Sequence, residues 1–206
     1  MTDFTRNDVE VLHRKAGFRG FYQLDVLTLR HRLFSGGWGP ELNRELFVRP
    51  EAVCVLPYDP WQDTVILLEQ MRIGALDKSA NPWLIELVAG LIDTDESAEE
   101  VAHREAAEEA DLRLLELIPI SSYYPSPGGS NERVHLYCAT VDSRQAGGVY
   151  GLDSEGEDIR ASVWSRNDAI SAMEQGRIDN AASIIALQWL ALHGQRLREQ
   201  AGAQPV

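Results

Sequence analysis

Three apolar runs in the centre of the chain set the strongest limit on its fold. They are "AVCVLPYD" (52–59), "TVILLEQM" (64–71) and "WLIELVAG" (83–90), and each has the length of a strand. A strand with one solvated face alternates apolar and polar residues, whereas these runs are apolar almost throughout. They therefore predict central strands covered on both faces, and hence a layered domain.

Weaker patterns on both sides supply the remaining elements. Further strands are expected within residues 21–33, 44–48, 114–120, 133–140 and 159–165, and helices over 96–110 and 180–197. Several strands with helices at two points predict an α+β fold. Residues 1–50 hold only a small sheet, which buries too little to be stable alone. We therefore divide the chain into an N-terminal region, 1–50, and a main domain, 51–206.

Composition limits the classes of partner. The formal net charge is −13, which argues against a protein that holds nucleic acid by a basic surface. The N-terminus lacks the pattern of a signal peptide, and no apolar run approaches 18 residues, so we expect a cytoplasmic protein without a membrane partner. Trp83 and Trp189 are expected in the core.

The helix expected over 96–110 carries an unusual concentration of negative charge. Glu105, Glu108 and Glu109 share one helical face, and Arg104 is the only adjacent cation. A solvated charged face is the ordinary explanation for such a helix. Carboxylates grouped in this way also bind hard divalent cations, which allow an acidic protein to hold a phosphate ligand.

The spacing around this helix favours the second explanation. Gly90 is separated by five residues from Glu96, which is followed after seven residues by Arg104-Glu105 and then by Glu108-Glu109. This arrangement resembles the Nudix box, G-x5-E-x7-R-E-u-x-E-E-x-G-u, where u is apolar. Only the closing glycine differs, because Asp111 stands there. Asp tolerates the left-handed conformation of such a helix end at a cost of about 1 kcal/mol.

The resemblance extends over most of the chain. The segments "LLEQMRIGA", "NPWLIELVAG", "SPGGSNE" and "DNAASIIALQWL" look like the bacterial ADP-ribose pyrophosphatase subfamily of the Nudix hydrolases. This resemblance implies an α/β/α sandwich around a mixed sheet, with a small N-terminal β-sheet layer used for dimerisation and adenine contact. It also implies hydrolysis of ADP-ribose to AMP and ribose 5-phosphate with Mg²⁺, or with Mn²⁺, in a homodimer.

The resemblance also assigns roles to individual residues. The metal ligands it implies are the Ala89 carbonyl, Glu105, Glu109 and Glu157, assisted by Glu108. Glu155 is the expected general base, with Glu157 as the alternative, and Arg104 is expected to hold a carboxylate in position. The implied substrate contacts are Arg72, Glu132, Arg44, Phe21, Pro127 and Gly128.

Some alternatives stay open at this point. Phe21 is equally consistent with a place in the core. Another nucleotide sugar, such as GDP-mannose, is the nearest alternative substrate, although the "SPGGSNE" segment argues against it. A sensor that binds ADP-ribose without cleaving it is a further alternative, which the four intact glutamates of the box disfavour.

Overall fold

The computed structural model of the protein describes residues 3–152, 154 and 156–202, which form two compact units. The first unit contains residues 1–50 and 124–133, and the second contains residues 51–123 and 134–206. The strands are β1 Val9–Arg19, β2 Gln23–His31, β3 Leu42–Val48, β4 Glu51–Asp59, β5 Thr64–Met71, β6 Trp83–Glu86, β7 Val88–Ile92, β8 Glu116–Tyr123, β9 Val134–Thr140, β10 Gly148–Tyr150 and β11 Ile159–Ser165. The helices are α1 Ala98–Ala110, α2 Arg166–Glu174 and α3 Ala181–Gln200, with short 3-10 turns at Arg6–Asp8 and Ile73–Ala75.

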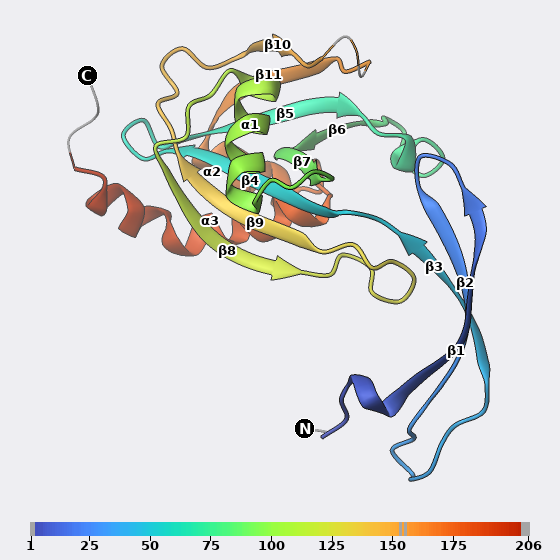
Figure 1. Ribbon diagram of the computed structural model, residues 1–206. Coiled ribbons are helices and arrows are strands. Elements are labelled where there is room, and N and C mark those ends of the chain that lie inside the picture. The colour runs from blue at the N-terminus through green and yellow to red at the C-terminus, as the bar shows by residue number, and fades with distance from the viewer. Residues whose placement is uncertain (1–2, 153, 155, 203–206) are drawn as a thin grey trace. The chain divides into compact units, whose positions relative to one another are not determined.

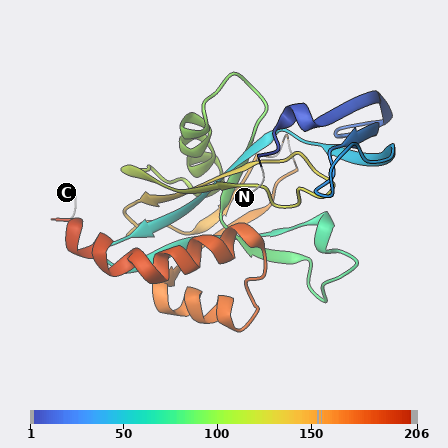
Figure 2. The same cartoon turned by 90° about the horizontal axis from the view of Figure 1, so that it is seen from below.

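The second unit is built on a mixed sheet of eight strands. Its main path runs β10-β11-β5-β4-β9-β8, while β6 pairs with β5 and β7 pairs with β4. Strands β4 and β9 are parallel, and the other pairs are antiparallel. Helix α1 covers one face of the sheet and helices α2 and α3 cover the other, which confirms the expected α/β/α layering (Figures 1 and 2).

Alternation along the central strands explains why their sequences are apolar throughout. In β4, Val53 and Val55 pack in the core beneath α1, whereas Cys54 and Leu56 pack in the core beneath α2 and α3. Strand β5 divides its residues between the two cores in the same way. Because successive side chains of a strand point to opposite faces, a sheet between two helical layers needs apolar residues at every position.

The first unit contains a three-stranded antiparallel sheet in the order β1-β2-β3. Most residues of β1 are exposed, and Asp25, which is paired with Arg14, is the buried residue of β2. Several aromatic side chains of this unit remain in solvent, including Phe18 at 62%, Phe21 at 86% and Phe34 at 87% exposure. The sheet therefore lacks a core of its own among the described residues.

Several elements depart from the sequence-based expectation. The run 83–90 forms two strands, because the chain passes from pairing with β5 to pairing with β4 at Leu87. Strands β1 and β10 and helix α2 were not expected. The prediction that Trp83 lies in the core is wrong, since its side chain is 51% exposed, whereas Trp189 does pack on the core beneath α3. Among the described residues, no helix is long and apolar enough to cross a membrane.

Candidate active site

Helix α1 is fixed at both ends by local interactions. Ser97 caps its start, and a reciprocal capping box joins Ser97 to Glu100. Asp111 ends the helix with φ 50° and ψ 41°, and its N–H donates to the Ala107 carbonyl. The expectation that Asp replaces the closing glycine in a left-handed conformation is therefore confirmed.

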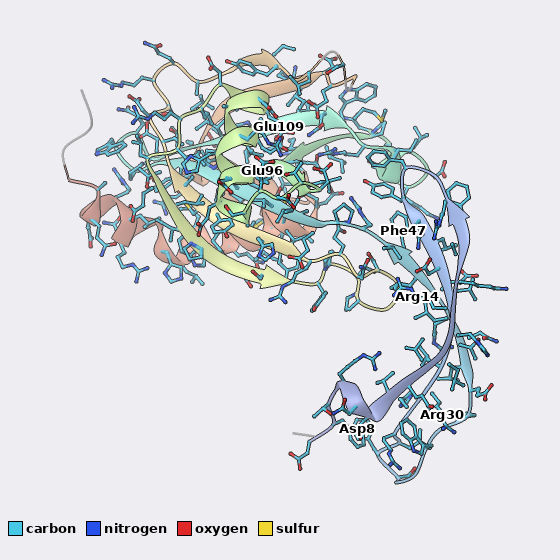
Figure 3. The ribbon with its side chains drawn as sticks, viewed as in Figure 1. Asp8, Arg14, Arg30, Phe47, Glu96 and Glu109 are labelled. Atoms are coloured by element: carbon cyan, nitrogen blue, oxygen red, sulfur yellow. The ribbon has the colours of Figure 1, made fainter. Side chains whose placement is uncertain are left out.

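Glu109 lies on the buried face of α1. Its side chain points toward β7, where the Ala89 N–H donates to Glu109 Oε2 at 2.9 Å, and only 2% of the residue is exposed (Figure 3). Burial, reinforced by the charges of Glu105 and Glu157, raises the pKa of Glu109 to about 8, against the opposing effect of the Ala89 N–H. This carboxyl group therefore carries a proton at neutral pH unless a cation compensates its charge.

Gly90 makes room for the second carboxylate of the helix. A Cβ atom at this position would overlap the side chain of Glu105, so no other residue fits while Glu105 keeps its place. Burial also raises the pKa of Glu105, an effect that Arg104 opposes and that Glu108 and Glu157 reinforce. The glycine of the motif thus allows the Glu105 carboxylate to lie against β7.

Arg104 joins three carboxylates of the motif. Its Nε donates to Glu96 Oε1 at 3.2 Å, and one terminal nitrogen donates to Glu105 Oε1 at 2.8 Å and to Glu108 Oε2 at 3.1 Å. Hydrogen bonding from Arg104 is the main cause of the lowered pKa of Glu96. Arg104 thus contacts three carboxylates, and its positioning role stays a prediction.

Two further charged groups face this cluster in the second unit. The Arg72 charge acts against the raised pKa of Glu109, and Arg72 Nε donates to Glu86 Oε2 at 2.6 Å. Glu157 adds to the raised pKa values of Glu105 and Glu109, and its Oε2 accepts from the Leu152 N–H at 3.1 Å. The structure therefore brings Arg72 and Glu157 into the electrostatic environment of the α1 carboxylates, while Glu155 lies outside the described residues.

The remaining substrate-contact candidates belong to the first unit. Phe21 is exposed in the turn before β2, so the alternative that it is a core residue is wrong. Arg44 lies on β3, and its guanidinium donates to the Asn43 carbonyl at 2.8 Å. Pro127 and Gly128 form the tip of an exposed turn, and Glu132 follows them with a mostly buried side chain.

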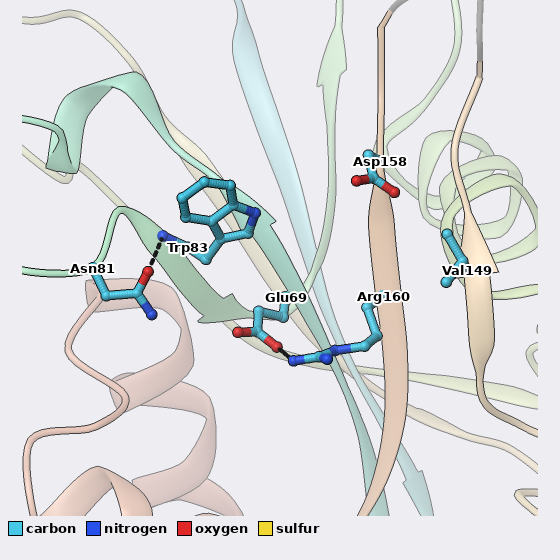
Figure 4. A pocket seen from close by; sticks show the side chains of 6 residues that line it. All are labelled: Glu69, Asn81, Trp83, Val149, Asp158 and Arg160. Atoms are coloured by element: carbon cyan, nitrogen blue, oxygen red, sulfur yellow. Dashed lines mark hydrogen bonds and ion pairs between the residues drawn. The ribbon is translucent and has the colours of Figure 1, made fainter.

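An open pocket of about 390 Å³ lies elsewhere in the second unit. Its lining residues are Glu69, Asn81, Trp83, Val149, Asp158 and Arg160 (Figure 4). An ion pair joins Glu69 to Arg160 on neighbouring strands β5 and β11. Because Leu68 faces α1, Glu69 faces the opposite side of the sheet, so this pocket is separate from the α1 carboxylates.

Comparison with known proteins identifies the family of this chain. A family model for the NUDIX domain matches residues 48–187. The chain belongs to the Nudix family. The ADP-ribose pyrophosphatase of Escherichia coli (strain K12) is 50% identical over 197 residues, which is 96% of this chain and 94% of that protein.

Other similar proteins share less with this chain. The GDP-mannose pyrophosphatase of Cronobacter sakazakii (strain ATCC BAA-894) is 33% identical over 157 residues, covering 74% of this chain and 79% of that protein. A crystal structure of an ADP compounds hydrolase aligns with a TM-score of 0.67 at 20% identity, covering 91% of this chain and 97% of that chain. This structural match supports the fold expected from the sequence.

Helix α1, which carries Arg104, Glu105, Glu108 and Glu109 and is called the Nudix helix below, fits a divalent cation by its chemistry. Within the described part of the chain, no three His, Cys, Asp or Glu side chains converge tightly enough to form a metal cluster. Arg104 engages Glu105 and Glu108 instead, and Glu109 turns to the Ala89 N–H. Burial, reinforced by neighbouring carboxylates, raises the pKa values of Glu105 and Glu109 although Arg104 pairs with Glu105, and oxygen ligands suit hard cations.

Sequence reasoning missed one charged member of this site. Glu86 is mostly buried in β6, where burial raises its pKa and Arg72 opposes the increase. The available signal was a carboxylate inside the apolar run "WLIELVAG", since a buried carboxylate nearly always has a cationic partner. Nothing in the sequence identified Arg72, 14 residues away, as that partner.

Proposed function

We propose that this protein is an ADP-ribose pyrophosphatase that hydrolyses ADP-ribose to AMP and ribose 5-phosphate with Mg²⁺. The observation that carries the proposal is the 50% identity to a protein of that name over nearly the full length of both chains. GDP-mannose pyrophosphatases are less similar and align over about three quarters of the chain. All four glutamates of the Nudix box are present, which favours catalysis over simple binding.

Residues of the second unit would hold the cation. We assign this role to Glu105, Glu109 and Glu157 together with the Ala89 carbonyl, with Glu108 assisting. A bound divalent cation neutralises carboxylates, polarises a phosphoryl group and lowers the pKa of a coordinated water. Arg104 would keep Glu105 and Glu108 in place through the hydrogen bonds that it donates in the structure.

The attack on phosphorus needs a base and a phosphate-binding cation. We assign the base to Glu155, with Glu157 as the alternative, because an acidic loop can close over a bound substrate. Water would add to one phosphorus of the diphosphate, lose its proton to that carboxylate and displace the other phosphate. Arg72, held by Glu86, would bind the diphosphate oxygens.

The register of the N-terminal sheet favours a homodimer. In the β2–β3 pairing Leu27 lies opposite Arg44, and Phe21 precedes Leu27 by six residues. Since β2 begins at Gln23, four residues or about 13 Å from Leu27 at 3.3 Å per residue, and Phe21 lies in the turn beyond Gln23, Phe21 and Arg44 of one chain are separated along the sheet. This separation disfavours a sandwich of one adenine ring between Phe21 and Arg44 of the same chain. We propose that two chains assemble through their N-terminal regions and that each adenine site takes Phe21 from one chain and Arg44 from the other.

A substrate panel tests the proposed reaction. The protein is incubated with Mg²⁺ and ADP-ribose, GDP-mannose or a dinucleotide, and the products are separated by chromatography. We expect AMP and ribose 5-phosphate from ADP-ribose, with kcat/KM at least about tenfold higher than for any other compound. Faster cleavage of GDP-mannose would refute the assigned substrate, and binding of ADP-ribose without cleavage would identify a sensor.

Co-expression of two differently tagged chains tests the shared adenine site. Phe21→Ala and Arg44→Ala are each expected to damage both sites of a homodimer. In a mixed dimer of the two variants one site is doubly altered and the other is intact. A random mixture should therefore recover about a quarter of the wild-type sites, since half of the dimers are mixed. No recovery in purified mixed dimers would refute the two-chain site.

A further inference from the structure

A serine, a histidine and a glutamate form a hydrogen-bonded array on the sheet of the second unit. Ser122 Oγ lies 2.9 Å from Nδ1 of His135, and Nε2 of the same ring lies 2.6 Å from Glu51 Oε2. Ser122 stands near the end of β8, His135 near the start of β9 and Glu51 at the start of β4. Both ring nitrogens of His135 are thus engaged by side chains from neighbouring strands.

The strand register explains why these side chains meet. Ser122 pairs directly with His135, and His135 pairs directly with Val53, which is two residues after Glu51. Residues paired in this way share a face of the sheet, as do residues two apart on one strand. Val53 packs in the core beneath α1, so the array lies on that face. Three adjacent strands therefore set its position, which is more accurate than a position set by a loop.

Strand β4 separates this array from the carboxylates of the Nudix helix. Val53 pairs with His135 on one side and, on the other side, with Gly90, against which Glu105 lies. At about 4.8 Å per strand, the backbones of His135 and Gly90 are about 10 Å apart. The two hydrogen bonds of the array involve none of the residues assigned to the cation or to the diphosphate. The array therefore has no part in the proposed hydrolysis of ADP-ribose.

The hydrogen-bonding capacity of each group fixes the direction of the array. A carboxylate only accepts hydrogen bonds, so Nε2 of the neutral imidazole carries the proton and donates to Glu51. Nδ1 then has a lone pair, which accepts the hydrogen bond that the Ser122 hydroxyl donates. A carboxylate that orients a histidine, which in turn accepts the proton of a hydroxyl group, is the arrangement that activates a serine nucleophile.

Exposure changes along the array in the order that this chemistry needs. Ser122 is exposed, whereas only 22% of the His135 side chain is exposed. A substrate can therefore reach the hydroxyl group, while the base is mostly shielded and keeps its orientation. The Glu51 side chain is 53% exposed, and a hydrogen bond to a group so open to solvent adds little to stability. Stability alone thus gives little reason for the arrangement.

The backbone beside Ser122 provides N–H groups for a developing negative charge. Among the described residues, β8 is the last strand of the eight-stranded sheet, so alternate N–H groups of this strand point away from β9. The pairing register of β8 also shifts between Pro119 and Ser121, immediately before Ser122. Such a bulge bends an edge strand, redirects its side chains and is common beside active sites. An oxyanion formed next to Ser122 therefore meets backbone donors at this edge.

We propose that this array is a second catalytic site, which transfers a small acyl group from an ester to water, with Glu51 as the positioning residue. Ser122 Oγ attacks the carbonyl carbon, and its proton passes to Nδ1 of His135. The bond between the carbonyl carbon and the alcohol oxygen breaks, and the alcohol leaves with that proton. Water then attacks the acyl-serine and gives a proton to Nδ1, which returns it to Ser122 Oγ as the carboxylic acid is released.

The surroundings of the array limit the class of ester. Ser122 is exposed, so the expected substrate has a small acyl group and an alcohol that leaves readily. The Glu51 carboxylate and the formal net charge of −13 favour a neutral or cationic ester over an anionic one. An uncharged aryl acetate meets these conditions.

Hydrolysis of para-nitrophenyl acetate by the full-length protein in the presence of a chelator tests the inference. The chelator stops cation-dependent cleavage of ADP-ribose, so the two activities are measured independently. We expect Ser122→Ala, His135→Gln and Glu51→Gln each to lower the protein-catalysed rate at least about tenfold. Glu51→Asp, which keeps the carboxylate, should recover part of the rate lost in Glu51→Gln. A fluorophosphonate should label Ser122 of the wild type, as located by mass spectrometry, and should not label it in His135→Gln.

Ser121→Ala and His103→Gln are the matched controls. Ser121 is also an exposed serine of β8, but it pairs with Leu136, which packs in the core on the opposite face. His103 is an exposed histidine of α1. Both variants should hydrolyse the ester at a rate within about twofold of the wild type.

Three results would overturn the inference. They are an unchanged rate of ester hydrolysis in Ser122→Ala, fluorophosphonate labelling at another residue, and a rate that the chelator abolishes, because that rate would belong to a cation site. Circular dichroism and the melting temperature show whether each variant is folded. Ser122→Ala removes only an exposed hydroxyl group, so it decides the question even if His135→Gln does not fold.

Discussion

The buried carboxyl group of Glu109 predicts how the stability of the metal-free protein depends on pH. In the unfolded chain this group releases its proton near its ordinary pKa of 4.5, whereas in the folded protein the pKa is about 8, mainly through burial. Below pH 4.5 Glu109 is protonated in both the folded and the unfolded state, so its burial does not lower the free energy of unfolding. Between about pH 4.5 and pH 8 Glu109 ionises in the unfolded chain but keeps its proton in the folded protein, so the free energy of unfolding falls as pH rises. Above pH 8 this loss of stability is complete.

The size of this penalty follows from the two pKa values. A difference of about 3.5 in pKa at 1.36 kcal/mol per pH unit gives at most about 5 kcal/mol at pH 8.5. In Glu109→Gln the amide oxygen can still accept the Ala89 N–H, but the side chain has no proton to lose. We therefore expect metal-free Glu109→Gln to be as stable as the wild type at pH 4.5 and more stable by up to about 5 kcal/mol at pH 8.5.

Urea unfolding in the presence of a chelator, followed by circular dichroism from pH 4.5 to pH 8.5, measures this difference. Glu99→Gln is the matched control, because Glu99 lies on the same helix but is exposed. Its stability should follow that of the wild type at every pH. If the unfolding free energy of the wild type does not fall relative to that of Glu109→Gln as pH rises, burial does not raise the pKa of the Glu109 carboxyl group.

Three further predictions concern the Nudix helix and its surroundings. Gly90→Ala should displace Glu105, destabilise the protein by about 1–3 kcal/mol in urea unfolding and lower kcat/KM at least about a hundredfold; near-normal activity would mean that Glu105 need not lie against β7. Asp111→Gly should raise the unfolding free energy by up to about 1 kcal/mol by relieving the left-handed backbone, with kcat unchanged; a loss of stability would contradict this account. Mg²⁺ binding at pH 7 should release close to one proton as Glu109 ionises, detected by calorimetry in buffers of different ionisation enthalpy; no buffer dependence would argue against a protonated Glu109.

The central layers of the fold could be predicted because their signals are local. Continuous apolar runs identified β4 and β5, and the absence of Gly and Pro with strong helix formers identified α1. Strand β1 was not predicted because most of its side chains are exposed, so no buried face imposes an alternation of apolar and polar residues on its sequence. The division of 83–90 into β6 and β7 also had no local signal, since it follows from which neighbour each half pairs with.

Of the candidate site, likewise, only the features set by local sequence could be predicted. The spacing of Glu105, Glu108 and Glu109 is a property of one helix; in the structure Arg104 joins Glu105 and Glu108, whereas Glu109 turns to the Ala89 N–H. The partners of Arg72 and Glu132 could not be predicted, because each ion pair joins residues that only the folded chain brings together.

A Mg²⁺ titration is the sharpest test of whether the carboxylates of α1 support cation-dependent cleavage. AMP release from ADP-ribose is followed at increasing Mg²⁺ concentration for the wild type, Glu109→Gln and the Glu99→Gln control. We expect the wild type and Glu99→Gln to require Mg²⁺, whereas Glu109→Gln should stay folded and lose at least about a hundredfold in kcat/KM. Cleavage by the wild type without any divalent cation, or full activity in Glu109→Gln, would show that these carboxylates do not act through a bound cation.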